Sequence, residues 1–243
     1  MANRALPAVL AKAAAVQARL GEALARYGRL VYSNSLGAEA VVLTDIIWTH
    51  LPRIDVFSID TGRLHEETYE LLERLQRRYQ RRLRLVYPDA QALEALVARQ
   101  GVNGFYESLS ARLECCRIRK VEPFRRAIAG YPAWITGVRR EQSTGRALGQ
   151  LEEWDAEHNL YKLSPLLEWS EADVWEYIRA RRLPYNVLHD RHYPSIGCSP
   201  CTRAIQPGES RRAGRWWWEQ SESRECGLHP RAGAAVAVAL APH

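Results

Sequence analysis

The sequence has little of what marks a secreted or membrane-bound protein. Five cysteines in 243 residues are too few, and odd in number, for a disulfide scaffold, so we expect a reducing, cytoplasmic compartment. An uncharged apolar run at residues 234–241 is less than half as long as a membrane span. Charged residues interrupt the alanine-rich residues 1–24, which are predicted to form an amphipathic helix. We therefore expect neither a signal peptide nor a membrane span.

The chain also lacks internal repeats and low-complexity linkers. This predicts one main domain, residues 1–205, followed by a C-terminal arm, residues 206–243. Hydrophobic residues make up 47% of the chain, enough for a sizeable core. The net charge of +6 favours anionic ligands, among them phosphate, sulfate and RNA, without requiring nucleic acid.

Short apolar segments alternate with amphipathic helical patterns. Such alternation predicts an α/β fold in which helices cover a parallel sheet. The predicted strands are residues 29–32, 54–59, 83–87 and 133–136, and the predicted helices are residues 38–50, residues 65–79 and several stretches between 90 and 129.

Loops that follow three of these strands are candidate ligand-binding segments, because ligands of such folds bind beyond the carboxyl ends of the strands. The first loop offers Ser33, Ser35 and Gly37 to an anion, although serine and glycine there also suit a simple helix cap. It matches neither the Walker A motif nor the G-x-G-x-x-G fingerprint. The three loops are residues 33–37, 60–63 and 137–146.

The cysteines divide into four and one. Cys115 and Cys116 are adjacent, and Cys198 and Cys201 form a C-x-x-C, so two pairs are available for one zinc ion or one iron–sulfur cluster. The adjacent pair favours a cluster, in which each thiolate binds its own iron. The alternatives are a buried apolar pair and a redox-active C-x-x-C. Cys226 stands apart in a polar, charged stretch, where it is a candidate nucleophile or a dispensable surface cysteine.

Residues 211–218 mix arginines with three consecutive tryptophans. This pattern suits stacking on nucleic-acid bases and, equally, packing of an arm against the domain.

Taken together, these motifs resemble the assimilatory sulfonucleotide reductases. Within that family they are most similar to the thioredoxin-dependent adenylyl-sulfate (APS) reductases that carry a [4Fe-4S] cluster. The resemblance covers nearly the whole chain except the tail after His229, and a linking segment at residues 163–175 extends it. Its motifs are residues 32–39 (YSNSLGAE), 59–63 (IDTGR), 114–120 (ECCRIRK), 136–143 (TGVRREQS), 193–201 (YPSIGCSPC) and 225–229 (ECGLH).

The resemblance implies an adenine nucleotide alpha hydrolase-like fold with a modified P-loop and a mobile C-terminal arm. It implies reduction of APS to sulfite and AMP in sulfate assimilation and cysteine biosynthesis. Cys226 would attack the sulfate sulfur and form an S-sulfocysteine, from which thioredoxin releases sulfite. The [4Fe-4S] cluster, held by Cys115, Cys116, Cys198 and Cys201, would act electrostatically and structurally, without carrying electrons.

Substrate-binding residues follow from the same resemblance and from the need for cations where an anion attacks an anion. The motif match assigns Lys120, Arg212 and Arg215 to the sulfate. Arg139, Arg140 and Arg146 are further candidates, although surface arginines are usually solvated. The residues expected around the adenosine and its phosphate are Ser33, Ser35, Gly37, Asp60, Gly62 and Gly137.

Three rival hypotheses remain at this point. A phosphoadenylyl-sulfate (PAPS) reductase, or an enzyme that accepts both nucleotides, shares most motifs but usually lacks the four ligand cysteines. An RNA-binding or tRNA-modifying protein with a four-cysteine metal site would leave Cys226 without a role. A structural zinc protein would also leave the three loops without a ligand. We expect no nucleic-acid partner and no membrane partner, and leave homo-oligomerisation open.

Overall fold

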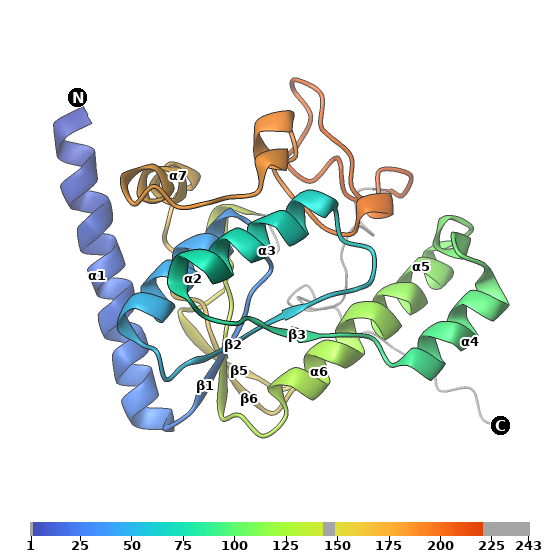
Figure 1. The fold of residues 1–243 in the computed structure, drawn as a ribbon, viewed down its shortest axis with the longest axis horizontal. Coiled ribbons are helices and arrows are strands. Elements are labelled where there is room, and N and C mark those ends of the chain that lie inside the picture. Colours follow the sequence, from blue (N-terminus) through green and yellow to red (C-terminus); the bar gives the residue numbers. More distant parts are fainter. Residues whose placement is uncertain (1, 143–148, 221–243) are drawn as a thin grey trace.

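The computed structural model describes residues 2–142 and 149–220 and is built around a six-stranded sheet of order β3-β2-β1-β4-β6-β5 (Figure 1). Neighbouring strands are parallel except for β5, which runs antiparallel to β6 at one edge. The predicted α/β class is therefore confirmed. The strands are β1 (Leu30–Ser33), β2 (Asp55–Ile59), β3 (Arg84–Val86), β4 (Ala133–Ile135), β5 (Glu152–Asp155) and β6 (Leu160–Leu163).

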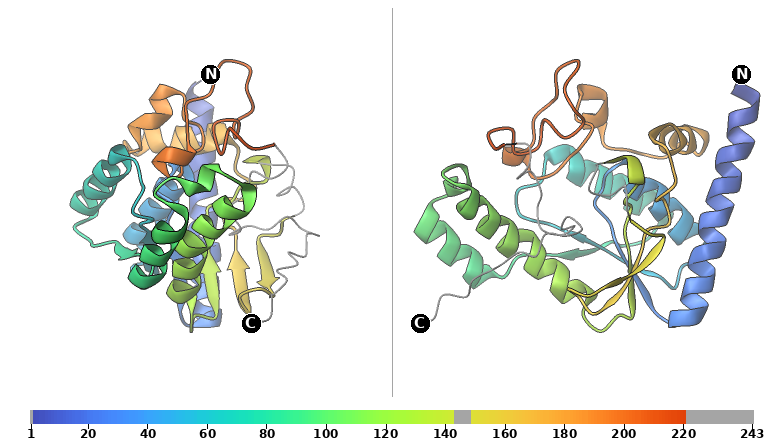
Figure 2. Two further views of the ribbon diagram at one scale, coloured as in Figure 1. Left: turned by 90° about the vertical axis from the view of Figure 1, so that its right-hand side faces the viewer. Right: turned by 180° about the vertical axis from the view of Figure 1, so that it is seen from behind.

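Helices cover both faces of the sheet, because its central strands are apolar on both sides. In β1, Leu30 and Tyr32 belong to one buried cluster, whereas Val31 belongs to another. Helices α1, α2, α3 and α7 pack on the first face and α6 on the second (Figures 1 and 2). The helices are α1 (Ala2–Tyr27), α2 (Ala38–His50), α3 (Glu66–Tyr79), α4 (Ala90–Gln100), α5 (Leu109–Cys116), α6 (Glu122–Ile128) and α7 (Glu171–Ala180).

The several helical stretches expected between residues 90 and 129 are confirmed as α4, α5 and α6. A π-helical turn, Arg117–Val121, which was not predicted, separates α5 from α6 directly after the adjacent cysteines. Such turns occur often at functional sites. The sequence reasoning also missed β5 and β6. Their connection ends at Asn159 with φ +58°, a local turn signal, and only the pairing of β6 with β4 makes this hairpin part of the sheet.

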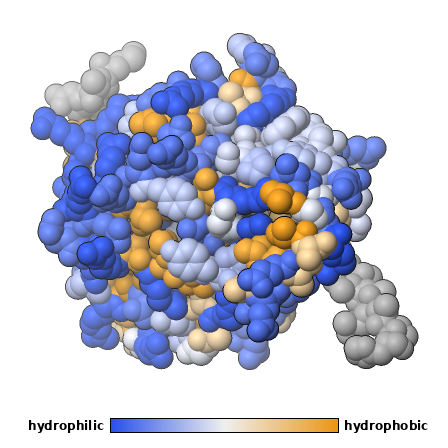
Figure 3. Space-filling model, turned by 45° about the vertical axis from the view of Figure 1, so that its right-hand side comes forward, coloured by the Kyte–Doolittle hydropathy of each residue, from blue (hydrophilic) through white to orange (hydrophobic). Residues whose placement is uncertain are grey.

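The surface is mainly hydrophilic on the face shown in Figure 3, where smaller apolar patches lie between hydrophilic side chains. Single exposed apolar residues such as Val102 and Trp154 are normal for a folded protein. Among residues 2–142 and 149–220, no helix is both long and apolar enough to cross a bilayer.

The buried carboxylate of Asp45 connects helices α2, α3 and α7 on the first face of the sheet. Asp45 in α2 is 1% exposed and accepts hydrogen bonds from Tyr79 Oη at 2.5 Å and Tyr177 Oη at 2.6 Å. Arg181 Nε donates a third, at 3.2 Å. These contacts fix α3 and α7 against α2, and α2 begins at the first candidate loop.

Replacing Asp45 with alanine is expected to lower the free energy of unfolding by about 3 kcal/mol, because three donors lose their acceptor. Urea unfolding of the wild type and the variant measures this loss. Asp55→Ala is the matched control, since Asp55 accepts one exposed hydrogen bond, from Tyr131. The control should lose less than about 1 kcal/mol. Equal losses in the two variants would contradict the buried network.

Candidate active site

The first candidate loop leaves β1 at the carboxyl edge of the sheet and is held by its own side chains. Asn34 Oδ1 accepts from the backbone N–H of Leu36 at 2.7 Å, and Asn34 Nδ2 donates to Thr44 Oγ1 at 2.7 Å. Leu36 has φ +57°, a left-handed conformation that turns the chain into α2. The N-cap of α2 is Gly37, which has no side chain to accept a capping hydrogen bond, so the N–H groups of the first turn suit an anion.

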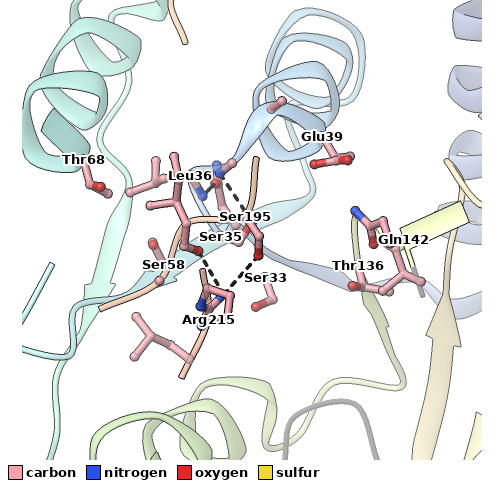
Figure 4. A pocket seen from close by; sticks show the side chains of 18 of the residues that line it. Ser33, Ser35, Leu36, Glu39, Ser58, Thr68, Thr136, Gln142, Ser195 and Arg215 are labelled. Carbon is pink, nitrogen blue, oxygen red and sulfur yellow. Dashed lines mark hydrogen bonds between the residues drawn. The ribbon is translucent and has the colours of Figure 1, made fainter. Parts of the chain in front are cut away.

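One cleft brings the predicted loops together. Ser33, Ser35 and Gly37 line it, as predicted. Figure 4 shows that Ser58, near the end of β2, and Thr136, directly after β4, lie around the same pocket. These two strands flank β1 in the sheet. The cleft therefore lies beyond the carboxyl ends of the parallel strands, where ligands of this fold class bind.

The loop after β2 contributes a different residue from those predicted. Asp60 Oδ1 accepts from the backbone N–H of Gly62 at 2.8 Å and from Tyr69 Oη at 2.9 Å, so the carboxylate shapes the turn. Asp60 and Gly62 are not among the residues that line the cleft, whereas Thr61, which lies between them in the sequence, lines it. Thr61 Oγ1 also lies 3.2 Å from Cys198 Sγ. The sequence reasoning placed Thr61 in the loop but did not single it out.

The loop after β4 brings a buried ion pair rather than a set of unpaired cations. Arg139 is 2% exposed, and its Nε donates to Glu39 Oε1 at 2.8 Å. Burial opposes ionisation of Glu39, but Arg139 outweighs it and lowers the pKa of that carboxyl. Arg139 thus lines the cleft with its charge compensated, which the sequence reasoning did not anticipate. A Cβ added to Gly137 would lie 3.3 Å from Glu39 Cβ, so this glycine permits the close approach of the loop to α2.

The other predicted cations separate into three groups. Lys120, Arg212 and Arg215 line the cleft, as the motif match implied. Arg140 is exposed, donates to the carbonyl oxygen of Gly149 at 3.2 Å and is not among the cleft residues. Arg146 lies outside the described residues. In Figure 4, Arg215 enters the pocket beside Ser195, whose Oγ accepts from Arg215 Nη1 at 3.3 Å.

The four predicted metal-binding cysteines surround one small cavity next to the cleft. Cys115 and Cys116 end α5, and Cys198 and Cys201 begin and end a short turn that starts with the backbone N–H of Ser199 bonded to Arg63 O at 2.8 Å. The structure shows none of the four in a disulfide, and they pack in one apolar cluster with Phe105 and Trp216.

The four thiols lie close enough to affect one another's pKa. Burial raises the pKa of the Cys201 thiol, and the thiols of Cys198, Cys116 and Cys115 raise it further because adjacent negative charges repel. Burial likewise raises the pKa of the Cys115 thiol, although Arg119 opposes this effect. Four thiols held so close are expected to exchange their protons for metal.

The four thiols around this cavity fit an iron–sulfur cluster, in which each thiolate binds a different iron. Among the described residues, no group of three or more His, Cys, Asp or Glu side chains is placed to hold a single metal ion. Two residues lining the cavity, Arg119 and Trp216, also have a buried Nε and Nε1 without a hydrogen-bond partner among the described residues. Such donors suit the sulfur atoms of a cluster.

The predicted C-terminal arm packs on the cysteine turn over its described part, residues 206–220. The backbone N–H of Trp216 donates to Cys201 O at 3.1 Å, and that of Arg203 donates to Gly214 O at 2.9 Å. A Cβ on Gly214 would lie 2.2 Å from Arg203 O, so close packing accounts for this glycine. Trp218 packs on Phe105 and Tyr106, which favours the packing interpretation of the tryptophans. Cys226 lies outside the described residues.

Comparison with known proteins gives consistent matches. Residues 29–204 match the model of the phosphoadenosine phosphosulfate reductase domain. Adenosine 5'-phosphosulfate reductase of Allochromatium vinosum is 54% identical over 83% of this chain and 79% of its own length. The protein of the same name from Burkholderia cepacia is 48% identical over 92% of this chain and 89% of its own length.

Solved structures agree on the fold. The phosphoadenylyl-sulfate reductase of Candida auris, in a phosphate complex, superposes with a TM-score of 0.67 and 28% identity, covering 79% of this chain and 90% of that one. FMN adenylyltransferase of Candida glabrata superposes with a TM-score of 0.59 at 16% identity, covering 96% of this chain and 82% of that one, and therefore shows the fold alone.

Proposed function

Because the chain belongs to the phosphoadenosine phosphosulfate reductase domain family, we propose that it reduces adenosine 5'-phosphosulfate to sulfite and AMP. The observation that carries this proposal is the shared wall between the cleft and the four-cysteine cavity. Lys120, Arg215 and Thr61 line both spaces, so the cations of the anion site stand directly beside the thiols. Nucleotide binding alone would not require this arrangement.

In the first step the Cys226 thiolate attacks the sulfur of the sulfate group. A bond forms between Cys226 Sγ and that sulfur, the bond from sulfur to the phosphate-bridging oxygen breaks, and AMP leaves with the electron pair. Both reactants are negatively charged. Lys120, Arg212 and Arg215 reduce their repulsion and stabilise the charge that builds up on the bridging oxygen.

In the second step a dithiol protein of the thioredoxin class supplies two electrons. Its thiolate attacks Cys226 Sγ, sulfite leaves, and a mixed disulfide forms. The second thiol of the reductant then resolves that disulfide and restores the Cys226 thiol. The dithiol is oxidised to a disulfide, and the sulfur of the sulfate group is reduced to sulfite.

A [4Fe-4S] cluster is the cofactor that the cysteine cavity fits. Cys115, Cys116, Cys198 and Cys201 would hold it, and Arg119 and Trp216 would donate to it. When bound, the cluster would supply a fixed electrostatic environment beside the sulfate site and would stiffen the cysteine turn. Lys120, which lines both spaces, is the cation best situated to act between the cluster and the substrate.

PAPS remains the second candidate substrate, because a phosphoadenylyl-sulfate reductase is among the similar structures. The several relatives named adenosine 5'-phosphosulfate reductase, at 47–54% identity, and the four cysteines favour APS. The RNA-binding alternative is less favoured, because Trp216 is 2% exposed and stacks between two arginines of the chain itself, although Trp217 is 36% exposed.

The proposal is tested by intact-mass measurement of anaerobically purified protein mixed with APS or PAPS without reductant. We expect the mass of one SO₃ group to be added with APS, and peptide mapping to place it on Cys226. Thioredoxin should then remove it as sulfite, with glutaredoxin as the comparison reductant. An adduct with PAPS alone would make the protein a PAPS reductase. The absence of an adduct with both nucleotides, in protein loaded with iron, would refute the mechanism.

A further inference from the structure

A completely buried arginine lies between the cysteine cavity and the arm. Arg112, in α5, is 0% exposed and lines the cavity. Its Nε and Nη2 donate to the two carboxylate oxygens of Glu219 at 2.8 and 2.7 Å, a bidentate pair. Glu219 is itself nearly buried, with 7% of its side chain exposed. The same guanidinium hydrogen-bonds the Cys116 thiol. The Arg112 side chain therefore connects Cys116, a predicted metal ligand, with Glu219 in the C-terminal arm.

Trp216 connects this pair to the substrate cleft. Its ring is flanked by two guanidinium groups, with Arg112 Cζ 4.7 Å and Arg215 Cζ 4.5 Å from the ring centroid. Each contact is a cation–π interaction. Trp216 has φ +44°, a conformation that non-glycine residues adopt only when their surroundings impose it. The Arg112–Glu219 pair is positioned to impose it, because Glu219 N–H also donates to Trp216 O at 2.9 Å.

Arg215 is the end of this chain of contacts that reaches the cleft. It is 7% exposed, and its guanidinium packs so closely on Gly197 that a Cβ there would lie 2.3 Å from Arg215 Nη2. Its Nη1 donates to Ser195 Oγ at 3.3 Å and to Ile196 O at 3.4 Å. Packing against Gly197 and against the Trp216 ring therefore contributes to the position of Arg215.

We propose that Arg112 is a positioning residue for the sulfate site. Through Glu219 and the Trp216 ring, Arg112 holds Arg215 in the cleft. The geometry of the anion site therefore depends on a residue of the cysteine cavity. This inference rests on the proposed function, because it takes the sulfate group as the partner of Arg215. Glu219 is required in this arrangement, since its carboxylate offsets the repulsion between two arginines that share one ring.

The inference predicts a loss of affinity that is specific for the sulfate group. Arg112→Lys keeps the charge but not the two-pronged geometry, so Arg215 should lose its fixed position. Binding is measured by calorimetry in a Cys226→Ser background, which prevents reaction with APS. We expect the dissociation constant for APS to rise by about tenfold or more and that for AMP to change less than about twofold. Iron content and visible absorption should stay at the level of the Cys226→Ser protein.

Two further variants keep the test decisive if Arg112→Lys folds poorly. Glu219→Gln preserves shape and should show the same selective loss of APS affinity to a smaller extent. Arg181→Met is the matched control, because it removes an ion pair with the buried Asp45, at 3.2 Å, away from both cavities. It should lower stability without changing the ratio of APS to AMP affinity.

The outcomes separate this inference from the proposed function. An unchanged affinity ratio in Arg112→Lys and Glu219→Gln would overturn the positioning role. A parallel loss of iron and of APS affinity would also overturn it, since Arg112 would then act by retaining the metal. If the Arg112-containing parent protein binds APS no more tightly than AMP, the proposed function fails instead.

Discussion

Replacement of Cys226 by serine is expected to lower kcat for APS reduction by at least about 10⁴-fold, because a neutral hydroxyl is a far weaker nucleophile than a thiolate. Substrate binding is a separate property of this protein. Within residues 2–142 and 149–220, the cleft is lined by Ser33, Lys120 and Arg215 among others, and the substitution changes none of these residues. The variant should therefore bind APS with an affinity within about twofold of the wild type, which calorimetry can measure.

The same variant gives a clear mass-spectrometric result. Wild-type protein incubated with APS should gain one SO₃ group, whereas Cys226→Ser should gain none. Its iron content should be unchanged, because the four cysteines of the cavity are untouched. If Cys226→Ser still forms the adduct, one of the cavity cysteines is the nucleophile. Cysteines that hold a cluster would not be available for that role.

Replacement of Cys201 by serine is expected to lower both iron content and activity. Cys201 is 9% exposed and packs with Phe105 and Trp216, and its thiol adjoins the three other cavity cysteines. A serine hydroxyl is a poor ligand for iron in a sulfur-bound cluster. We expect iron content to fall below about half of the wild-type value and kcat/KM to fall about 10³-fold or more, because the cysteine turn also supports the arm.

Iron and zinc analysis by inductively coupled plasma mass spectrometry measures the first effect, and sulfite release measures the second. Cys226→Ser is the control, as it should lose activity while keeping iron. Full iron content in Cys201→Ser would contradict the four-cysteine site. Stoichiometric zinc in anaerobically purified wild-type protein would show that the four cysteines hold a single zinc ion and not an iron–sulfur cluster.

The fold was largely predictable because its signals are local. Apolar runs such as residues 29–32 and 54–59 became β1 and β2, and the long amphipathic pattern over residues 65–79 became α3. The β5–β6 hairpin was missed, since its charged and aromatic residues form a sheet edge only by pairing with β4. The interruption of the helical stretch after Cys116 was missed as well, because a π-helical turn has no strong sequence signal.

The sequence identified several residues that the fold brings to the cleft, but it did not indicate which of the cations are paired with carboxylates. Lys120, Arg212 and Arg215 line the cleft, Arg139 lines it while paired with Glu39, and Arg140 lies outside it. Nothing in the sequence distinguishes an arginine that faces a substrate from one that a carboxylate compensates. That difference depends on which acidic side chain the fold brings near.

The sequence by itself determined the class of sheet, the three loops at its carboxyl edge and the two cysteine pairs. Each of these features depends on residues that lie within a few positions of one another in the chain. Only the tertiary structure decided that the pairs share one cavity with the cleft wall, and that Arg112 meets Glu219 across 107 positions. The physical reason is burial. A buried charge is stable only beside a partner, and that partner can come from any part of the chain that the fold brings near. The order of residues in the sequence therefore does not identify the partner.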